Sequence, residues 1–142
     1  MATATVTPPW AYTLQLPQDP RAPGVARATL RTVLRVHGLA QLTDTAELLA
    51  GELVTNAYLY SKGAFSLRLR GAGRQRIRLS VWDTNPHIPA PFSRPTETPP
   101  VLAERGRGLH LITHWAESWG AHPMGSGLPG QGGKLLWVEC AV

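Results

Sequence analysis

The sequence predicts a single α/β domain in which two amphipathic helices precede a set of strands. Apolar residues recur at helical spacing over residues 25–36 and again over residues 43–60. From Phe65 onwards the period changes to two, and a glycine turn at residues 71–73 joins two such strands into a hairpin. With 142 residues, of which 43% are hydrophobic, the chain can build one core and has little room for a second domain.

The first half of the chain predicts a strand and then the two helices. Residues 10–16 alternate in the manner of a strand, and three prolines within residues 17–23 separate them from the first helix. That helix is expected to end at Gly38, because glycine is the commonest residue just beyond a helix C-terminus. Thr43 and Asp44 mark the start of the second helix, since both residue types are favoured there.

The second half predicts a hairpin, a long loop, a helix and two more strands. Residues 85–105 carry six prolines and no periodicity, which is typical of a lid or a recognition segment. Helical spacing follows over residues 109–115. Strands are expected at residues 119–124 and 135–142, with a glycine-rich turn at residues 125–133 between them. We find no internal repeat and no linker between domains.

Composition narrows the class of protein. No apolar run approaches the roughly 18 residues that a membrane-spanning helix needs. Residues 1–9 lack the basic start and apolar centre of a secretory signal, so we expect a cytoplasmic protein with a disordered N-terminal segment. Cys140 is the only cysteine, which excludes an internal disulfide, and we expect it to be buried. A formal net charge of +5 is only a hint of an anionic ligand.

Most of the hairpin's charge lies on one face. Alternation places four arginines opposite the predicted core, namely Arg68, Arg70, Arg76 and Arg78. A platform for nucleic acid is one interpretation, but the hairpin lacks the interleaved aromatic residues that stack on bases. We favour a solvent-exposed sheet face or a dimer contact.

Two polar residues interrupt the apolar surroundings of the second helix. Glu52 and Asn56 are four residues apart, so they lie on the same side of the helix, among leucine, valine and alanine. A carboxylate and an amide that face a cavity together can bind a divalent cation and polarise a nucleophile. The alternative is that both side chains simply face water.

Asp83 ends the second strand of the hairpin. Strand parity places it on the same face as Leu79 and Val81, toward the predicted core. A buried carboxylate needs hydrogen-bond donors, and the exocyclic amine of a purine base is one candidate. The other interpretation is an aspartate that starts the turn at Thr84 and Asn85.

Glycines precede the third predicted helix and the last predicted strand. Gly106 and Gly108 allow backbone amides to approach an anion at a helix N-terminus, and Arg105 and Arg107 are placed to add contacts to phosphate. A flexible loop end explains this motif equally well. An ordinary turn is likewise the alternative to a site at residues 132–134.

Four motifs occur in order along the chain: Glu52-Leu53-Val54-Thr55-Asn56-Ala57, Val81-Trp82-Asp83, Gly106-Arg107-Gly108-Leu109 and Gly133-Lys134-x-x-Trp137. In this order and spacing they resemble the N, G1, G2 and G3 boxes of the GHKL superfamily of histidine kinase-like ATPases. The resemblance covers roughly residues 10–142. Within the superfamily, the chain is most similar to stand-alone actinobacterial ATP-binding proteins related to anti-sigma-factor serine/threonine kinases.

The resemblance implies a two-layer α/β sandwich of the Bergerat type. ATP would lie between the helices and a mixed, mostly antiparallel sheet, under a lid formed by residues 85–105. Asn56 would coordinate Mg²⁺, Glu52 would be the general base and Asp83 would bind adenine. The further residues implied in cofactor binding are Arg105, Gly106, Arg107, Gly108, Leu109 and Lys134.

The function implied is Mg²⁺- and ATP-dependent phosphorylation of an anti-sigma-antagonist protein. The alternative is a non-catalytic pseudokinase that binds a sigma factor or another regulator. It is favoured by the segment after Asp83, which contains no glycine where anti-sigma kinases carry Asp-x-Gly-x-Gly. Proteins of this kind often form homodimers, and direct contact with nucleic acid or a membrane is not expected.

Overall fold

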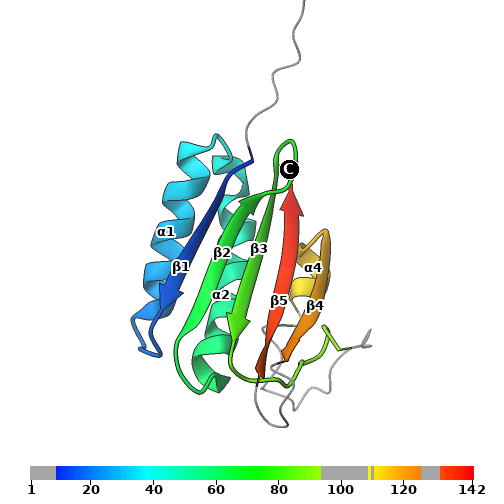
Figure 1. Ribbon diagram of the computed structural model, residues 1–142. Coiled ribbons are helices and arrows are strands. Elements are labelled where there is room, and N and C mark those ends of the chain that lie inside the picture. Colours follow the sequence, from blue (N-terminus) through cyan, green and yellow to red (C-terminus); the bar gives the residue numbers. More distant parts are fainter. Residues whose placement is uncertain (1–8, 94–108, 110, 126–131) are drawn as a thin grey trace, which may run out of the picture.

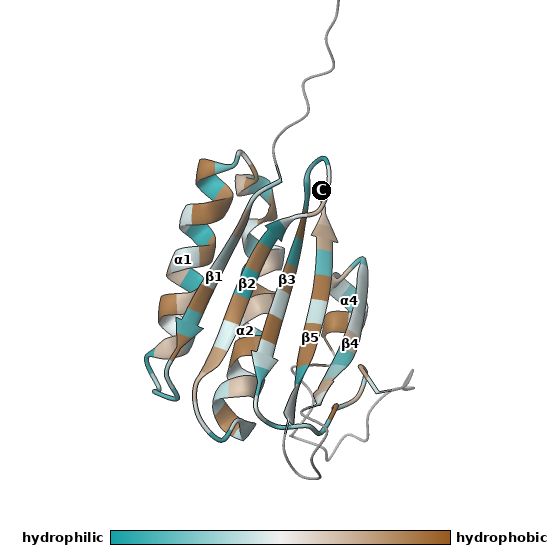
Figure 2. Cartoon of the chain, in the orientation of Figure 1, coloured by the Kyte–Doolittle hydropathy of each residue, from teal (hydrophilic) through white to brown (hydrophobic). Residues whose placement is uncertain are grey.

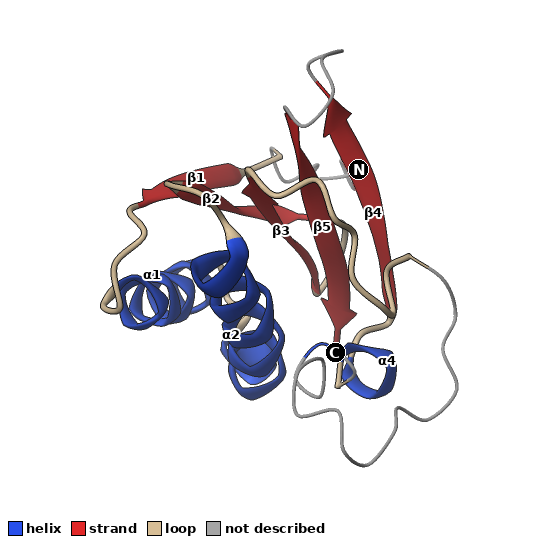
Figure 3. Cartoon of the chain, turned by 90° about the horizontal axis from the view of Figure 1, so that it is seen from below, coloured by secondary structure: helices blue, strands red, loops and turns tan. Residues whose placement is uncertain are grey.

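A computed structural model describes residues 9–93, 109, 111–125 and 132–142 of the chain. Five strands form one sheet in the order β1-β2-β3-β5-β4 (Figure 1). The helices lie on one side of this sheet, as the view from below shows (Figure 3). In chain order the elements are β1 (Ala11–Leu16), α1 (Ala22–Val36), the 3₁₀ helix η1 (Ala40–Leu42), α2 (Thr43–Tyr60), β2 (Phe65–Gly71), β3 (Arg76–Asp83), α4 (Ile112–Trp115), β4 (Ser118–Gly125) and β5 (Gly132–Ala141).

The expected two-layer α/β sandwich is confirmed. Each pair of neighbouring strands in the described part of the chain is antiparallel, so the parallel neighbours of a mixed sheet are not found there. The core lies between the helices and the sheet. It includes Leu30 and Leu34 of α1, Leu53 of α2 and Leu79 of β3, each of which is fully buried. Burial of such a side chain contributes about 1.5–3 kcal/mol to folding, so this core fixes how the two layers face each other.

The second helix, α2, begins at Thr43 and ends at Tyr60, as the sequence predicts. Asp44 in its first turn interacts favourably with the positive end of the helix dipole. The Thr43 hydroxyl does not cap the helix, because it donates to the Ala40 carbonyl oxygen at 2.6 Å. Buried leucines, valine and alanines hold α2 against the sheet, and this packing sets the direction of its polar residues.

Alternation in β2 and β3 separates an apolar face from a polar one, as predicted (Figure 2). Phe65, Leu67, Ile77 and Leu79 are fully buried on the helix side. Asp83 falls on the same face at the end of β3 and is 1% exposed. Strand parity therefore carries a carboxylate into the interior.

Two of the four hairpin arginines form ion pairs on the bare side of the sheet. The Arg78 Nε atom donates to Glu139 Oε1 at 2.8 Å, and its guanidinium lies 4.0 Å from the centroid of the Trp137 ring. Arg76 pairs with Glu117 at 2.5 Å and lies 3.6 Å from Glu139. Glu139 on β5 and Glu117, which directly precedes β4, thus neutralise part of the charge of this face.

Two predicted boundaries differ from the structure. β5 begins at Gly132, before the predicted start at residue 135, so Gly133 and Lys134 belong to a strand. The predicted turn at residues 125–133 was therefore wrong for residues 132 and 133. Pairing of Gly132 and Gly133 with Gly125 and Met124 of β4 outweighs the low strand propensity of glycine. Of the helix predicted over residues 109–115, Leu109 is helical, Leu111 forms a turn and Ile112–Trp115 form α4.

Two expectations from composition can also be compared with the structure. Cys140 is 1% exposed, which confirms its burial, and this burial raises the pKa of its thiol to about 12. None of the helices in the described part of the chain is long and apolar enough to cross a membrane. Residues 1–8 and 94–105, which carry most of the predicted disordered segment and of the predicted lid, lie outside the described residues.

Candidate functional site

A pocket of about 380 Å³ opens beside the C-terminal half of α2, and its volume is in the usual range for small-molecule sites. Three predicted site residues from distant parts of the sequence meet here: Asn56 of α2, Leu109, and Lys134 of β5. The loop after β3 supplies another wall. The lining residues are Asn56, Tyr60, Asn85, His87, Pro89, Ala90, Leu109 and Lys134.

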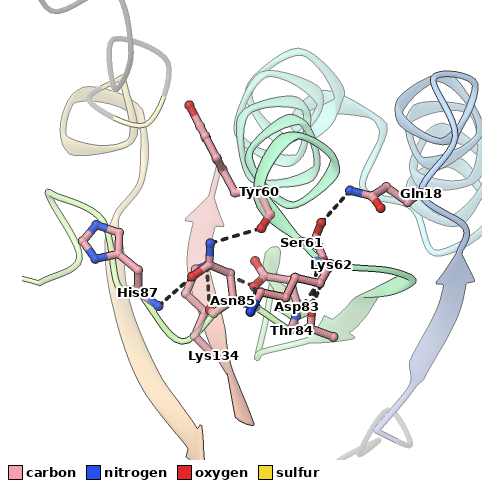
Figure 4. Close-up of polar contacts among 9 residues, drawn as sticks. All are labelled: Gln18, Tyr60, Ser61, Lys62, Asp83, Thr84, Asn85, His87 and Lys134. Carbon is pink, nitrogen blue, oxygen red and sulfur yellow. Dashed lines mark hydrogen bonds and ion pairs between the residues drawn. The ribbon is translucent and has the colours of Figure 1, made fainter. Parts of the chain in front are cut away.

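An ion pair between two neighbouring strands lies at the edge of this pocket. The register of β3 and β5 places Asp83 opposite Lys134, and both residues are only 1% exposed. Lys134 Nζ donates to Asp83 Oδ1 at 3.0 Å and to the Asn85 carbonyl oxygen at 3.0 Å (Figure 4). These bonds compensate the cost of burying both charges.

Gly133 permits the close approach of β5 to the end of β3. A Cβ atom at this position would overlap the Asp83 carbonyl oxygen. Any side chain would therefore push the two strands apart next to the ion pair. The glycine that precedes Lys134 is required here by packing against backbone.

Hydrogen bonds fix the start of the loop after β3 against the end of α2 (Figure 4). The Asn85 N–H donates to Asp83 Oδ1 at 2.7 Å, and the Asn85 side-chain amide donates to the Tyr60 carbonyl oxygen at 3.1 Å. The hydroxyl groups of Thr84 and Ser61 lie 2.9 Å apart. The His87 N–H donates to Asn85 Oδ1 at 2.9 Å. The segment after Asp83 contains no glycine, and polar side chains hold it in place instead.

Asn56 and Glu52 differ in their surroundings on α2. Asn56 is buried, lines the pocket, and has a side-chain oxygen that accepts no hydrogen bond from any described residue. Such a buried acceptor is costly unless a ligand or an ion contacts it. Glu52, one helical turn earlier, is partly buried, and this burial raises the pKa of its carboxyl group. Asn56 therefore combines a place in the pocket wall with a side-chain oxygen that has no partner among the described residues.

Comparison with known families matches residues 16–125 to the histidine kinase-like ATPase domain. This match covers most of the chain. It includes the helices, the hairpin, and the pocket residues that lie on α2 and on the loop after β3. The chain belongs to the histidine kinase-like ATPase family. No curated protein matches the sequence closely.

Domains of the histidine kinase-like ATPase family bind ATP, generally with Mg²⁺, and the pocket residues fit such a ligand. Mg²⁺ takes oxygen ligands and binds through few protein groups together with substrate phosphates. The unpartnered Oδ1 atom of Asn56 is one such ligand. Lys134 also lines the pocket, and its charge is paired with that of Asp83.

Part of the predicted site can be placed and part cannot. Arg105, Gly106, Arg107 and Gly108 lie outside the described residues. The sequence interpretation did not include Tyr60 in the site, and it included His87, Pro89 and Ala90 only as part of the predicted lid of residues 85–105. Tyr60 could have been found, because it follows Asn56 by four residues on the same helix face. The loop residues have no periodicity from which their position could be inferred.

Proposed function

We propose that this ATPase-family protein is a Mg²⁺- and ATP-dependent serine/threonine protein kinase that phosphorylates an anti-sigma-antagonist protein. The observation that carries the proposal is the position of Asn56, which lines the pocket and whose buried side-chain oxygen has no hydrogen-bond partner among the described residues. Glu52 lies one helical turn away on the same helix. An amide oxygen that can bind a metal ion and a carboxylate one helical turn away are suited to phosphoryl transfer, because this reaction depends on charge neutralisation and positioning.

In this proposal Asn56 holds Mg²⁺, and Mg²⁺ neutralises charge on the phosphates when it is bound. Glu52 accepts the proton of the serine or threonine hydroxyl. The hydroxyl oxygen forms a bond to the γ-phosphorus of ATP as the bond from that phosphorus to the bridging oxygen breaks, and ADP leaves. The raised pKa of Glu52 brings this carboxyl group closer to neutral pH, where a general base is more effective.

The decisive experiment is transfer of labelled γ-phosphate from ATP to purified anti-sigma-antagonist proteins, compared between two variants of α2. Glu52→Gln should abolish transfer and leave ATP binding intact, because it removes only the proton acceptor. Glu47→Gln is the matched control, since Glu47 lies on the same helix nine residues before Asn56 and pairs with Arg31 at 2.9 Å. Equal transfer by Glu52→Gln and the unaltered protein would contradict the role of Glu52.

A non-catalytic pseudokinase that binds a sigma factor or another regulator is the second candidate. It is favoured by the contacts of Asp83, which is already engaged by Lys134 and by the Asn85 N–H. This alternative predicts a stable complex with a purified sigma factor that Glu52→Gln leaves unchanged. It also predicts no labelled product in the transfer experiment. The kinase proposal requires the labelled product.

A further inference from the structure

The described helices leave one side of the sheet bare (Figure 3). A hollow of about 340 Å³ lies on this bare side, on strands β2, β3 and β5. The pocket beside α2 lies on the helix side, so the hollow is separate from it. The hollow is lined by Arg68, Arg70, Arg78, Ser80 and Leu135.

Strand register brings the arginines of the hollow together. Arg70 of β2 lies directly opposite Arg78 of β3, and Arg68 lies opposite Ser80. Opposite residues on neighbouring strands have Cβ atoms only about 4.5–5.5 Å apart, and like charges in such positions repel each other. Glu139 neutralises Arg78, whose Nε atom donates to it at 2.8 Å. Neither Arg68 nor Arg70 forms an ion pair with another described residue, so the hollow keeps a positive charge.

A hydroxyl group without a partner lies among these arginines. Ser80 is 8% exposed and lines the hollow. Its hydroxyl forms no hydrogen bond with another described residue, so it can donate to a molecule that enters the hollow. Guanidinium groups bind a carboxylate through two parallel hydrogen bonds, in a planar geometry that suits both groups. The donors of the hollow therefore match an oxygen anion.

The tryptophans of the bare side offer little for the stacking of bases. Trp137 of β5 lies opposite Ser80, but the Arg78 guanidinium covers its ring at 4.0 Å from the ring centroid. A Cβ atom on Gly120 would come within 2.6 Å of the same ring, so the indole packs directly on the backbone of β4. Trp82 lies two residues beyond Ser80 along β3, outside the lining of the hollow. Single-stranded nucleic acid needs free aromatic faces beside its phosphates, whereas carboxylates need only the donors.

A second copy of the chain also fits this side poorly. A symmetric dimer places the same surface on both sides of its interface. If the interface were centred on the hollow, the arginines of one copy would meet those of the other, and such a juxtaposition of like charges is unfavourable. The charge of the hollow favours a partner of opposite sign.

We propose that the bare side of the sheet binds an acidic segment of a partner protein, whose carboxylates accept hydrogen bonds from Arg68, Arg70 and Ser80. Leu135 lines the same hollow and contacts the aliphatic part of the acidic side chains. Several carboxylates and arginines form a network, which contributes more than an isolated pair of surface charges. The bound carboxylates also relieve the repulsion between Arg70 and Arg78.

The test is a fluorescence anisotropy titration of the full-length protein with a labelled peptide of alternating glutamate and alanine. A peptide with glutamine in place of every glutamate keeps the length and loses the charge, so it is the matched probe. The glutamate peptide should bind at least about tenfold more tightly, which corresponds to one charge-assisted hydrogen bond. Added salt should weaken this binding, because it screens exposed charges. Equal binding of the two peptides would overturn the proposal.

Two double variants with the same loss of charge locate the bound peptide. Arg68→Gln with Arg70→Gln should weaken the glutamate peptide by at least about tenfold. Arg27→Gln with Arg35→Gln changes exposed positions of α1 and should weaken it by less than about threefold. The variant of the hollow should fold, since it also removes the repulsion between Arg70 and Arg78. Equal weakening by the two double variants would overturn the assignment to the hollow.

Three further results would show a different occupant, and each of them would overturn the proposal. Inorganic phosphate that displaces the peptide at an equal concentration would indicate a site for free anions. A labelled thymidine oligonucleotide that binds more tightly than the peptide, and that depends on Arg68 and Arg70, would indicate a nucleic-acid surface. Self-association in analytical ultracentrifugation that Arg68→Gln with Arg70→Gln abolishes would indicate a second copy of the chain.

Discussion

Replacement of Lys134 by methionine should destabilise the protein by about 3–5 kcal/mol, the usual cost of breaking a buried ion pair. Methionine is similar in length and keeps most of the packing, so the loss is mainly electrostatic. Lys134 Nζ and Asp83 Oδ1 are 3.0 Å apart, and both residues are 1% exposed. At an effective dielectric constant of about 20, two unit charges at this distance attract by roughly 5.5 kcal/mol. The carboxylate left behind is buried without a counter-ion.

Urea denaturation followed by tryptophan fluorescence measures this loss. Lys62→Met carries the same substitution at an exposed site and should change the free energy of unfolding by less than about 0.5 kcal/mol. The double variant Asp83→Asn with Lys134→Met has no buried charge and should recover more than half of the lost stability. The reasoning is refuted if Lys134→Met is no less stable than Lys62→Met, or if the double variant is as unstable as the sum of the single variants.

Three further predictions concern stability and reactivity. In thermal melts, Gly133→Ala should lower the free energy of unfolding by about 1–3 kcal/mol, because its Cβ would overlap the Asp83 carbonyl oxygen. Gly51→Ala in α2, where a Cβ meets nothing within 4 Å, should raise it by about 0.5–1 kcal/mol. Equal melting temperatures of the two variants would contradict this prediction. Burial raises the pKa of Glu52 above its ordinary value of 4.5, so its charged form opposes folding at neutral pH and not below that value. Glu52→Gln should therefore stabilise the protein at pH 7, and urea denaturation should show that this gain shrinks as the pH falls; a gain that grows toward acid would count against the burial argument. The Cys140 thiol, with its pKa raised to about 12, should react with a thiol reagent only after global unfolding, and labelling of the native protein at the rate of a free thiol would exclude this.

The helices and the hairpin are predictable because each depends on a local pattern. Helical spacing predicts α1 and α2, and alternation predicts β2 and β3 together with the burial of Asp83. The start of β5 is less predictable. Its first residues are glycines, and they belong to the strand because they pair with the end of β4.

The candidate site is predictable only where it depends on one element. Glu52 and Asn56 are adjacent by helical spacing alone. The pair of Asp83 and Lys134 joins residues 51 positions apart, so it depends on the register of two strands that no local pattern specifies. The wall formed by Pro89 and Ala90 likewise depends on a loop that is fixed by side-chain hydrogen bonds to α2.

The central claim is that the pocket beside α2 binds ATP with Mg²⁺ through Asn56. Calorimetric titration of ATP with and without Mg²⁺ tests it most directly, with Asn56→Ala beside Thr55→Ala, an exposed neighbour on the same helix. We predict that Mg²⁺ strengthens ATP binding by at least about tenfold in the unaltered protein and in Thr55→Ala, and that this gain is lost in Asn56→Ala. ATP affinity that is independent of Mg²⁺, or an Asn56→Ala variant that keeps the full gain, would contradict the claim.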